Sequence, residues 1–356
     1  MEALAQPVEV LESPVARERD QRAPRQHANI KRVVGRFQTP ILWRSLMQIA
    51  TSFGGFLATC TAMYFSLEVS YWLTLALAPL AAGFLVRIFI IQHDCGHASF
   101  FRSRRAMAVV GFLCSLATLT PFASWRRQHK GHHAIWNNLD RRQSGVDIYS
   151  TCLTVAEYRR LSPGQRRRYS LARHPLVANV LFPPMVFLLL YRLPFDMPKA
   201  WRRERREVLL TNLAVLVLYG GLGLLVGFGN LIAVQLPVSI LGAIIGVGLF
   251  TLQHRGEDVK WSRREEWDPA AASLEGATYL RLPGILHWFT GNIGFHHVHH
   301  LNHRVPNYRL QQTHEAIASL LPKVPTLSLW SGLKALRFAL WDESRGRMVT
   351  FREAAA

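Results

Sequence analysis

The chain has 356 residues and a formal net charge of +19, with 49% hydrophobic but only 18% charged residues. The basic residues flank long uncharged apolar runs, and no motif of the usual nucleic-acid-binding modules is present. The charge therefore indicates contact with an anionic membrane surface and not with nucleic acid. Four cysteines without a CxxC pair exclude a disulfide framework and a zinc ribbon. Together these features indicate an integral membrane protein.

The N-terminal residues 1–45 are polar and of mixed charge, and they contain Pro7, Pro14 and Pro24. They lack the apolar core of a secretory signal, so we predict a cytosolic, partly disordered lead-in.

Four apolar segments have the length of membrane-spanning helices, about 21–23 residues each. They are residues 46–68, 71–91, 208–228 and 231–253. Short links join the first to the second and the third to the fourth, which predicts two helical hairpins. Arg87 is the only charged residue in the interiors of these segments.

The loop between the hairpins is strongly basic. Residues 101–206 carry twenty Lys and Arg against five Asp and Glu, which predicts a cytoplasmic location by the positive-inside rule. Two shorter apolar stretches, 106–123 and 176–194, are interrupted by Pro121 and by Pro183-Pro184. We predict interfacial or re-entrant helices there, with a six-span arrangement as the alternative.

Histidines recur in three clusters, each of which follows an apolar segment. They comprise His93 and His97; His129, His132 and His133; and His296, His299 and His300. Residues three and four apart share a helix face, so we expect each cluster to direct its imidazoles at one spot. Two predicted spans separate the second cluster from the third. All three clusters should therefore reach the cytoplasmic face and form one polynuclear metal site.

The number of imidazoles bears on the metal. Eight exceed what one tetrahedral zinc ion binds, and they fit two metals with about four nitrogens each. An all-nitrogen set with open positions favours iron and dioxygen over magnesium or calcium, which prefer oxygen ligands. The Glu-x-x-His pairs of soluble di-iron bundles are missing from the sequence. A structural di-zinc protein is the alternative, because zinc also binds imidazole.

Three stretches resemble the membrane fatty acid desaturase family, in particular its acyl-lipid ω-6 (Δ12-like) subgroup: HDCGHASFF, SWRRQHKGHHA and LEGATYLRLPGILHWFTGNIGFHHVHHLNHRVPNYRL. The resemblance covers about residues 45–320. With the hydropathy, it implies an all-α integral membrane fold with four transmembrane helices in two hairpins, interfacial helices, a kinked acyl tunnel and a cytosolic helical cap that holds a di-metal site. We expect a desaturase domain over 46–320 and an amphipathic cytosolic tail over 321–356, helical at 327–341.

The resemblance implies that the eight clustered histidines bind two iron ions. It also implies a ninth ligand near the cytosolic end of the fourth span, where this chain has His254; an interfacial histidine is the alternative. His297 lies about 100° around a helix from His296 and should face away from the metals. We expect structural roles for His287 and His303.

Three polar residues are candidates to orient ligand imidazoles by accepting a ring N–H: Asp94, Asp147 and Asn292. Asp94 fits equally well as a plain helix-end carboxylate. Three tryptophans fit either the tunnel mouth or the membrane interface: Trp125, Trp136 and Trp288.

The activity that the resemblance implies is O₂-dependent insertion of a cis double bond into the acyl chain of a lipid, a CoA ester or an acyl carrier, with reduction of O₂ to water. No catalytic residue beyond the metal ligands is needed. His174-Pro175 lacks the glycines of a fused cytochrome b5-like domain. We therefore expect electrons from a separate carrier such as a ferredoxin, attracted to the basic cytoplasmic face. In a bacterium the enzyme would lie in the inner membrane, with its active site on the cytoplasmic face.

Two other activities stay open as alternatives. Hydroxylases and ketolases of the same non-haem di-iron group share the histidine clusters and differ after hydrogen abstraction. A histidine-rich metal transporter would instead place ionisable ligands near the bilayer midplane, where the predicted spans have none.

Overall fold

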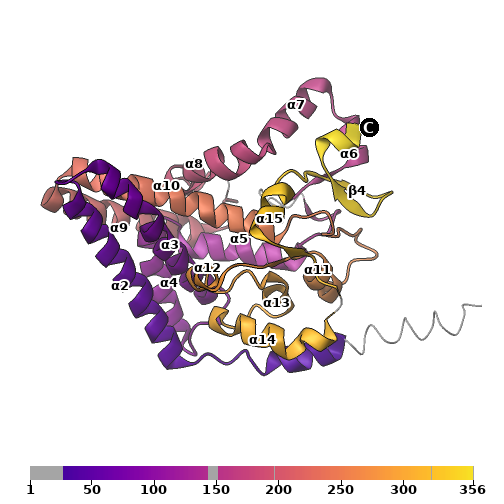
Figure 1. Cartoon of the computed structure of the whole chain (residues 1–356), viewed down its shortest axis with the longest axis horizontal. Helices are drawn as coiled ribbons and strands as arrows, with labels where there is room; N and C mark the ends of the chain where they lie inside the picture. The colour runs from indigo at the N-terminus through magenta and orange to yellow at the C-terminus, as the bar shows by residue number, and fades with distance from the viewer. Residues whose placement is uncertain (1–26, 143–150, 196, 322, 356) are drawn as a thin grey trace, which may run out of the picture.

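The computed structural model describes residues 27–142, 151–195, 197–321 and 323–355. Four helices in this part of the chain are long and apolar enough to cross a membrane: α2 (Leu42–Ser66), α3 (Tyr71–Gly96), α9 (Arg202–Val226) and α10 (Phe228–Gln253). They confirm the four predicted spans and their pairing into two hairpins (Figure 1). The first span begins at Leu42 and not at residue 46, and α3 continues into the first histidine cluster.

The two hairpin links are explained by local chemistry. Ser70 begins α3, and its hydroxyl accepts a hydrogen bond from the backbone N–H of Trp72. Gly227 joins α9 to α10 with φ of +85°, a conformation that a side chain would strain. Each hairpin can therefore reverse direction within a few residues.

The first of the two shorter apolar stretches forms a sharp bend. α4 (Arg104–Thr118) and α5 (Phe122–Ile135) meet at 100°, with Leu119 in the left-handed region and Pro121 just before α5. The second stretch is broken into η2 (Val177–Leu181), α8 (Phe182–Leu188) and η3 (Leu190–Arg192), and it is bent by 52° from the preceding helix. Neither forms a straight span, as predicted.

The remaining elements are short. The helices are α6 (Val155–Arg160), α7 (Pro163–Ala172), α11 (Pro269–Glu275), α12 (Gly284–Phe289), α13 (His296–Leu301), η4 (Asn307–Arg309), α14 (Leu310–Ile317), η5 (Ala318–Leu320), α15 (Leu329–Ala335) and α16 (Phe351–Ala355). The strands are β1 (Leu153–Thr154), β2 (Tyr279–Leu280), β3 (Thr326–Leu327), β4 (Leu340–Asp342) and β5 (Arg347–Val349). β1 pairs parallel with β4, β4 antiparallel with β5, and β2 parallel with β3.

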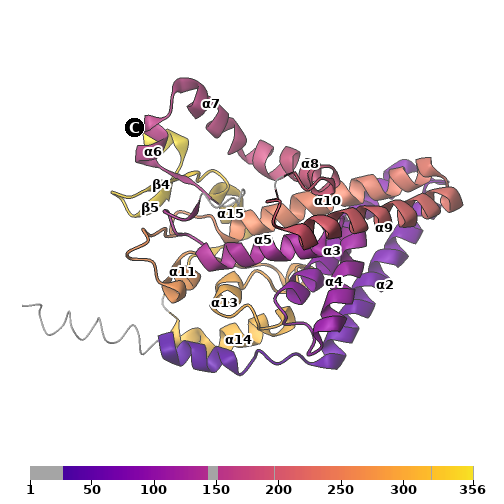
Figure 2. The same cartoon turned by 180° about the vertical axis from the view of Figure 1, so that it is seen from behind.

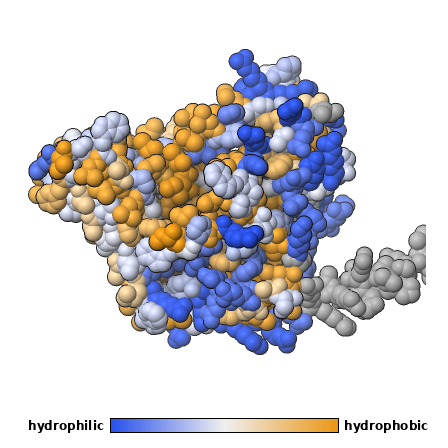
Figure 3. Space-filling model, viewed as in Figure 1, coloured by the Kyte–Doolittle hydropathy of each residue, from blue (hydrophilic) through white to orange (hydrophobic). Residues whose placement is uncertain are grey.

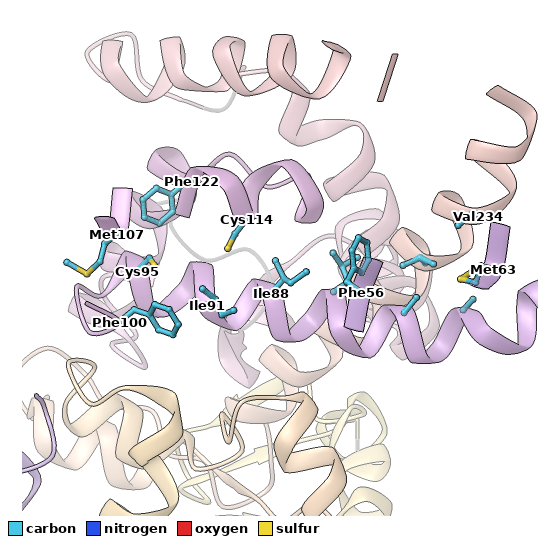
Figure 4. Packing of buried hydrophobic residues seen from close by; sticks show 14 residues of the cluster. Phe56, Met63, Ile88, Ile91, Cys95, Phe100, Met107, Cys114, Phe122 and Val234 are labelled. Carbon is cyan, nitrogen blue, oxygen red and sulfur yellow. The ribbon is translucent and has the colours of Figure 1, made fainter. Parts of the chain in front are cut away.

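The main hydrophobic core lies along α3. Ile88 and Ile91 of this helix are buried together with Phe56 of α2, Cys114 of α4 and Phe122 of α5 (Figure 4). Packing on several sides explains why α3 is the most buried of the four spans. It also fixes the end of α3, where the first two ligand candidates lie.

Part of the N-terminal lead-in packs against the cap. Residues 27–35 are helical, and Ile30 and Val34 lie in one hydrophobic cluster with Val298 of α13 and Leu310 of α14. Both views show this indigo helix beside α14 (Figures 1 and 2). Residues 27–35 of the lead-in therefore pack with α13 and α14.

The C-terminal tail corrects one prediction. The expected amphipathic helix over 327–341 is found only at Leu329–Ala335, because Leu327 belongs to β3 and β4 begins at Leu340 and pairs with β5. Leu340 is fully buried and Trp341 nearly so. The apolar residues at this end are therefore buried in a strand that pairs with β5, and they do not form the apolar face of a helix.

The surface separates a membrane part from a water-exposed part. Hydrophobic residues gather over the end of the molecule formed by α9 and α10, and hydrophilic residues over the opposite end near α6 and β4 (Figure 3). Leu224 and Leu225 of α9 are 82% and 80% exposed, which only a lipid environment tolerates over a whole helix.

Candidate metal centre

The first histidine group joins three segments. α3 supplies His93 and, as its C-cap, His97, while α5 supplies His129 and α13 supplies His299. One ligand atom from each ring lies within 4.8 Å of all the others. Three of the four side chains are buried, and His97 is partly exposed.

The second group joins α5, α10 and α13 through His132, His254, His296 and His300. The His254 Nε2 atom is central, because it lies 3.0 Å from Nε2 of His132, 2.9 Å from that of His296 and 3.3 Å from that of His300. His254 is fully buried as the C-cap of α10. The structure thus places the predicted ninth histidine within a metal-ligand arrangement.

The second and third clusters are each divided between the two groups. The expectation that each cluster directs its imidazoles at one spot is therefore wrong for both. His129 and His132 differ by about 60° around the axis of α5, enough to serve separate positions. In α13, His299 faces the first group while His296 and His300 face the second.

His133 lies between the two groups. Its Nε2 atom is 3.3 Å from Nε2 of His129 and 3.0 Å from that of His299. Its ring centroid is 4.3 Å from that of His300. With His133 the structure brings all nine predicted ligands together.

The spacing of the nitrogens fits metal coordination. Two nitrogens bound to one ion at about 2.1 Å are about 3.0 Å apart at a right angle and about 3.4 Å apart at a tetrahedral angle. The Nε2 separations around His254, 2.9 to 3.3 Å, are close to these values. A neutral imidazole has one N–H and cannot make hydrogen bonds along all of these lines. A shared ion satisfies them all.

The protonation of the rings also fits. Burial is the main cause that lowers the pKa well below the usual value for six of them: His97, His129, His133, His296, His299 and His300. Metal ligation requires the neutral ring. In addition, the buried Nε2 of His97 has no hydrogen-bond partner among the described residues, although it belongs to the first group. An ion bound by the first group would give this nitrogen a partner.

Asp94 holds the first group in place through a buried network. Its Oδ1 atom lies 3.1 Å from Nδ1 of His93, which leaves Nε2 for the ion. Its Oδ2 atom accepts from the backbone N–H and the side-chain amide of Asn307, at 2.7 and 2.8 Å. The Asn307 amide and that of Gln48 on α2 donate to each other's oxygen, at 3.2 and 3.1 Å.

Sequence reasoning missed Asn307 and Gln48 as partners of Asp94 in this network. Gln48 lies in an apolar segment far from the histidine clusters, and no local pattern connects it with them. Asn307 does lie in the third resembling stretch, which was the one available signal. The network links α2, α3 and η4 behind one ligand.

The other predicted residues have different places. The Asn292 amide donates to the Asn307 carbonyl at 3.4 Å, so the structure directs it to this network and not to a ligand imidazole. Asp147 lies outside the described residues. His297 faces away from both groups, with Nε2 3.0 Å from Nδ1 of His314. The ring of His303 lies 4.9 Å from that of His97, at the exposed edge of the first group.

The three tryptophans lie in three different environments. Trp125 stacks on His129 at 4.6 Å between ring centroids and lines the cavity below the histidines. Trp136 is buried with its ring 3.9 Å from that of His254. Trp288 lies on the other side of α3, where Arg87 stacks on it.

A cavity of about 430 Å³ runs from both histidine groups into the membrane part. His93 and His129 of the first group and His132 and His296 of the second line one end of it. The rest is mostly apolar and comes largely from α3, α8 and α10. Gly246 leaves room in the wall, since nothing lies within 4 Å of where its side chain would begin.

Fold and site together define a membrane protein with two histidine groups that could hold metal ions at the end of an apolar cavity. The family model described as "Fatty acid desaturase" matches residues 70–330. The chain belongs to the fatty acid desaturase family and is a fatty acid desaturase.

Relatives agree with this assignment. A protein named "Fatty acid desaturase" from Bacillus subtilis (strain 168) is 43% identical over 319 residues, which cover 90% of this chain and 89% of that relative. An "sn-1 oleoyl-lipid 12-desaturase" from Anabaena variabilis is 28% identical over 71% of each chain. An "sn-1 acyl-lipid omega-3 desaturase (ferredoxin)" from Synechocystis is 29% identical over 66% of this chain and 64% of that relative.

Proposed function

We propose that this desaturase introduces a cis double bond at the Δ12 (ω-6) position of an acyl chain carried by a membrane lipid. The apolar cavity that ends at both histidine groups carries this proposal. The name of the Anabaena relative, an oleoyl-lipid 12-desaturase, supports the lipid-bound substrate and the position. The hydroxylase and ketolase alternatives have no such support.

The metal that we propose is iron, with two ions held by nine histidines: His93, His97, His129, His132, His133, His254, His296, His299 and His300. When bound, the ions supply the activation of O₂ for removal of two hydrogens from adjacent methylenes. The overall reaction takes two electrons and two protons besides these hydrogens, and it reduces O₂ to two waters.

In this proposal the protein positions the acyl chain and the ligand rings relative to each other. The walls of the cavity hold the acyl chain by apolar contact and keep water from it. Trp125 fixes the ring of His129 by stacking, and Asp94 fixes that of His93 by a hydrogen bond. The methylenes nearest these rings are those that react.

The active site in this proposal faces the cytoplasm, and the electrons come from a ferredoxin. The excess of Lys and Arg in residues 101–206 supports the orientation and would attract an acidic carrier. The name of the Synechocystis relative mentions ferredoxin. We expect the rate of reduction by ferredoxin to fall steeply as salt is added; a rate independent of salt would contradict this docking mode.

The experiment is expression in a host that makes oleoyl lipids but no dienes, followed by mass spectrometry that locates double bonds. We expect a Δ12 diene on intact lipids and none with a His132→Ala variant. A new double bond in saturated chains would overturn the position, and an oxygenated product would overturn the reaction. Metal analysis of the active protein should find iron, and zinc alone would overturn the metal.

A further inference from the structure

A second pocket lies on the other side of α3 from the acyl cavity. It is open, has a volume of about 770 Å³, and shares no lining residue with the cavity. The first turns of α2, Arg87 of α3, the segment around α12 and residues of 307–311 form its walls, and Figure 1 shows α12 beside α3. The pocket contains none of the nine ligand candidates, although Gln48 and Asn307 in its wall also belong to the Asp94 network.

Arg87 of α3 is the unusual residue here. Its side chain lines the pocket, yet the residue is only 8% exposed. Its Nη1 atom donates to the Trp288 carbonyl, and its guanidinium lies 3.9 Å from the centroid of the Trp288 ring. Its Nε atom has no hydrogen-bond partner in the described part of the chain.

The charge of Arg87 is not neutralised by the protein that the structure describes. No carboxylate among residues 27–142, 151–195, 197–321 and 323–355 lies within ion-pair distance of it in the structure. A buried cation in a membrane helix is costly unless an anion or several dipoles accompany it. One carbonyl and one aromatic ring supply part of this, and an anion in the pocket would supply the rest.

The other residues of the pocket suit an anion as well. Its sixteen lining residues include two arginines and no Asp or Glu. Arg44, the second arginine, lies on α2 with its guanidinium 5.5 Å from the centroid of the Trp43 ring. Gln48, Asn307 and the Tyr308 hydroxyl add neutral polar groups. The pocket is thus cationic and lined in part by neutral polar groups.

The rim of the pocket on α2 is apolar and exposed. Trp43 is 63% and Met47 is 54% exposed on α2, and Leu46 beside them is 52% exposed. Acyl chains could lie along these side chains while a head group enters the pocket. A free anion would gain nothing from this rim.

We propose that this pocket binds the phosphate of an anionic membrane phospholipid, with Arg87 and Arg44 as its cationic ligands. The lipid is a bound companion and not the substrate, because the cavity that reaches the histidines lies across α3. Its acyl chains lie against the exposed side chains at the start of α2. This inference does not depend on which double bond the enzyme introduces.

The test uses the metal-loaded enzyme in nanodiscs of phosphatidylcholine with or without phosphatidylglycerol. Native mass spectrometry counts the lipid that stays bound, and thermal unfolding measures its effect. We expect wild type to retain phosphatidylglycerol selectively and to unfold at a higher temperature with it. Arg87→Gln should weaken this binding about ten- to hundredfold, because charge-assisted hydrogen bonds are lost, and Arg44→Gln should weaken it less.

Matched controls distinguish a lipid site from general attraction to basic residues and from a site for free anions. Arg102→Gln removes an arginine outside the pocket and should leave lipid binding unchanged. Glycerol 3-phosphate should not displace the lipid, and if it binds as tightly, the site is one for free anions and the proposal fails. If Arg87→Gln does not fold, Arg87→Lys and Arg44→Gln provide the test. Retention of phosphatidylglycerol by these variants at the wild-type level would overturn the proposal.

Discussion

The two histidine groups use the same kind of ligand, but different surroundings support them. In the first group the carboxylate of Asp94 contacts His93 and is itself held by Asn307. In the second group aromatic rings pack around His254, with Trp136 at 3.9 Å and Phe250 at 5.3 Å between centroids. A carboxylate makes its imidazole a more basic ligand, whereas aromatic packing fixes a ring without adding charge. We therefore expect the two metal positions to respond to different substitutions.

The largest effect should come from His254→Ala. Its Nε2 atom contacts three other ligand candidates of the second group, so its loss should leave about one metal per chain. Desaturation should fall by more than about a hundredfold, because loss of a residue that only supports a ligand already costs roughly 10- to 100-fold. Elemental analysis and fatty-acid profiling measure both. The control is His297→Gln, which alters a buried histidine of α13 directed at His314. Equal metal loss in that control would show that the grouping is wrong.

Asp94→Asn should affect the first group alone. Removal of the charge behind His93 should weaken metal binding there by about 10- to 100-fold, the usual effect of losing such a partner. Titration of metal-free protein with Fe²⁺ should show one weakened and one unchanged site. Equal weakening of both would mean that the network through Asn307 supports the whole centre, and the contrast between the groups would be lost.

Gly246→Leu should change the acyl cavity and leave both groups intact. The new side chain would project into open space in the wall, so long chains should react roughly tenfold more slowly or at a shifted position. The control is Gly248→Leu on the same helix, which also has room but does not line the cavity. Fatty-acid profiles and metal content measure these effects. Identical profiles for the two variants would show that Gly246 does not limit the space for the acyl chain.

Trp136→Phe should have the smallest effect. It keeps a ring beside His254 but loses the hydrogen bond from Nε1 to the Gly276 carbonyl, 2.6 Å long and worth about 1 kcal/mol. The unfolding midpoint should fall by about 2 °C with the metal content unchanged. If one metal were lost instead, the indole would be a positioning group for His254 and more than a packing partner.

Much of the membrane part could be predicted from the sequence. Long apolar segments have few alternatives in a bilayer, and α2, α3, α9 and α10 appear where hydropathy indicated. The end of the tail was different, because apolar residues at Leu340 and Trp341 fit a helical period and a short strand equally well. Pairing with β5 decided between them, and such tertiary pairing leaves no local pattern.

The metal centre was predictable as a set of residues but not as two groups. Spacing indicated which histidines gather, and it could not indicate how His129 and His132 divide between two positions, since this depends on how α5 packs against α13. The network of Gln48 and Asn307 was out of reach for the same reason. Contacts between distant segments are set by the fold.

The position of α13 in the chain has a consequence for biosynthesis. This short helix supplies ligands to both groups, and it follows all four spans in the sequence. Neither ligand set is complete until the ribosome has passed the last span and both hairpins have entered the bilayer. Metal insertion is therefore a late step of maturation, and a chain truncated before α13 would reach the membrane without a functional centre.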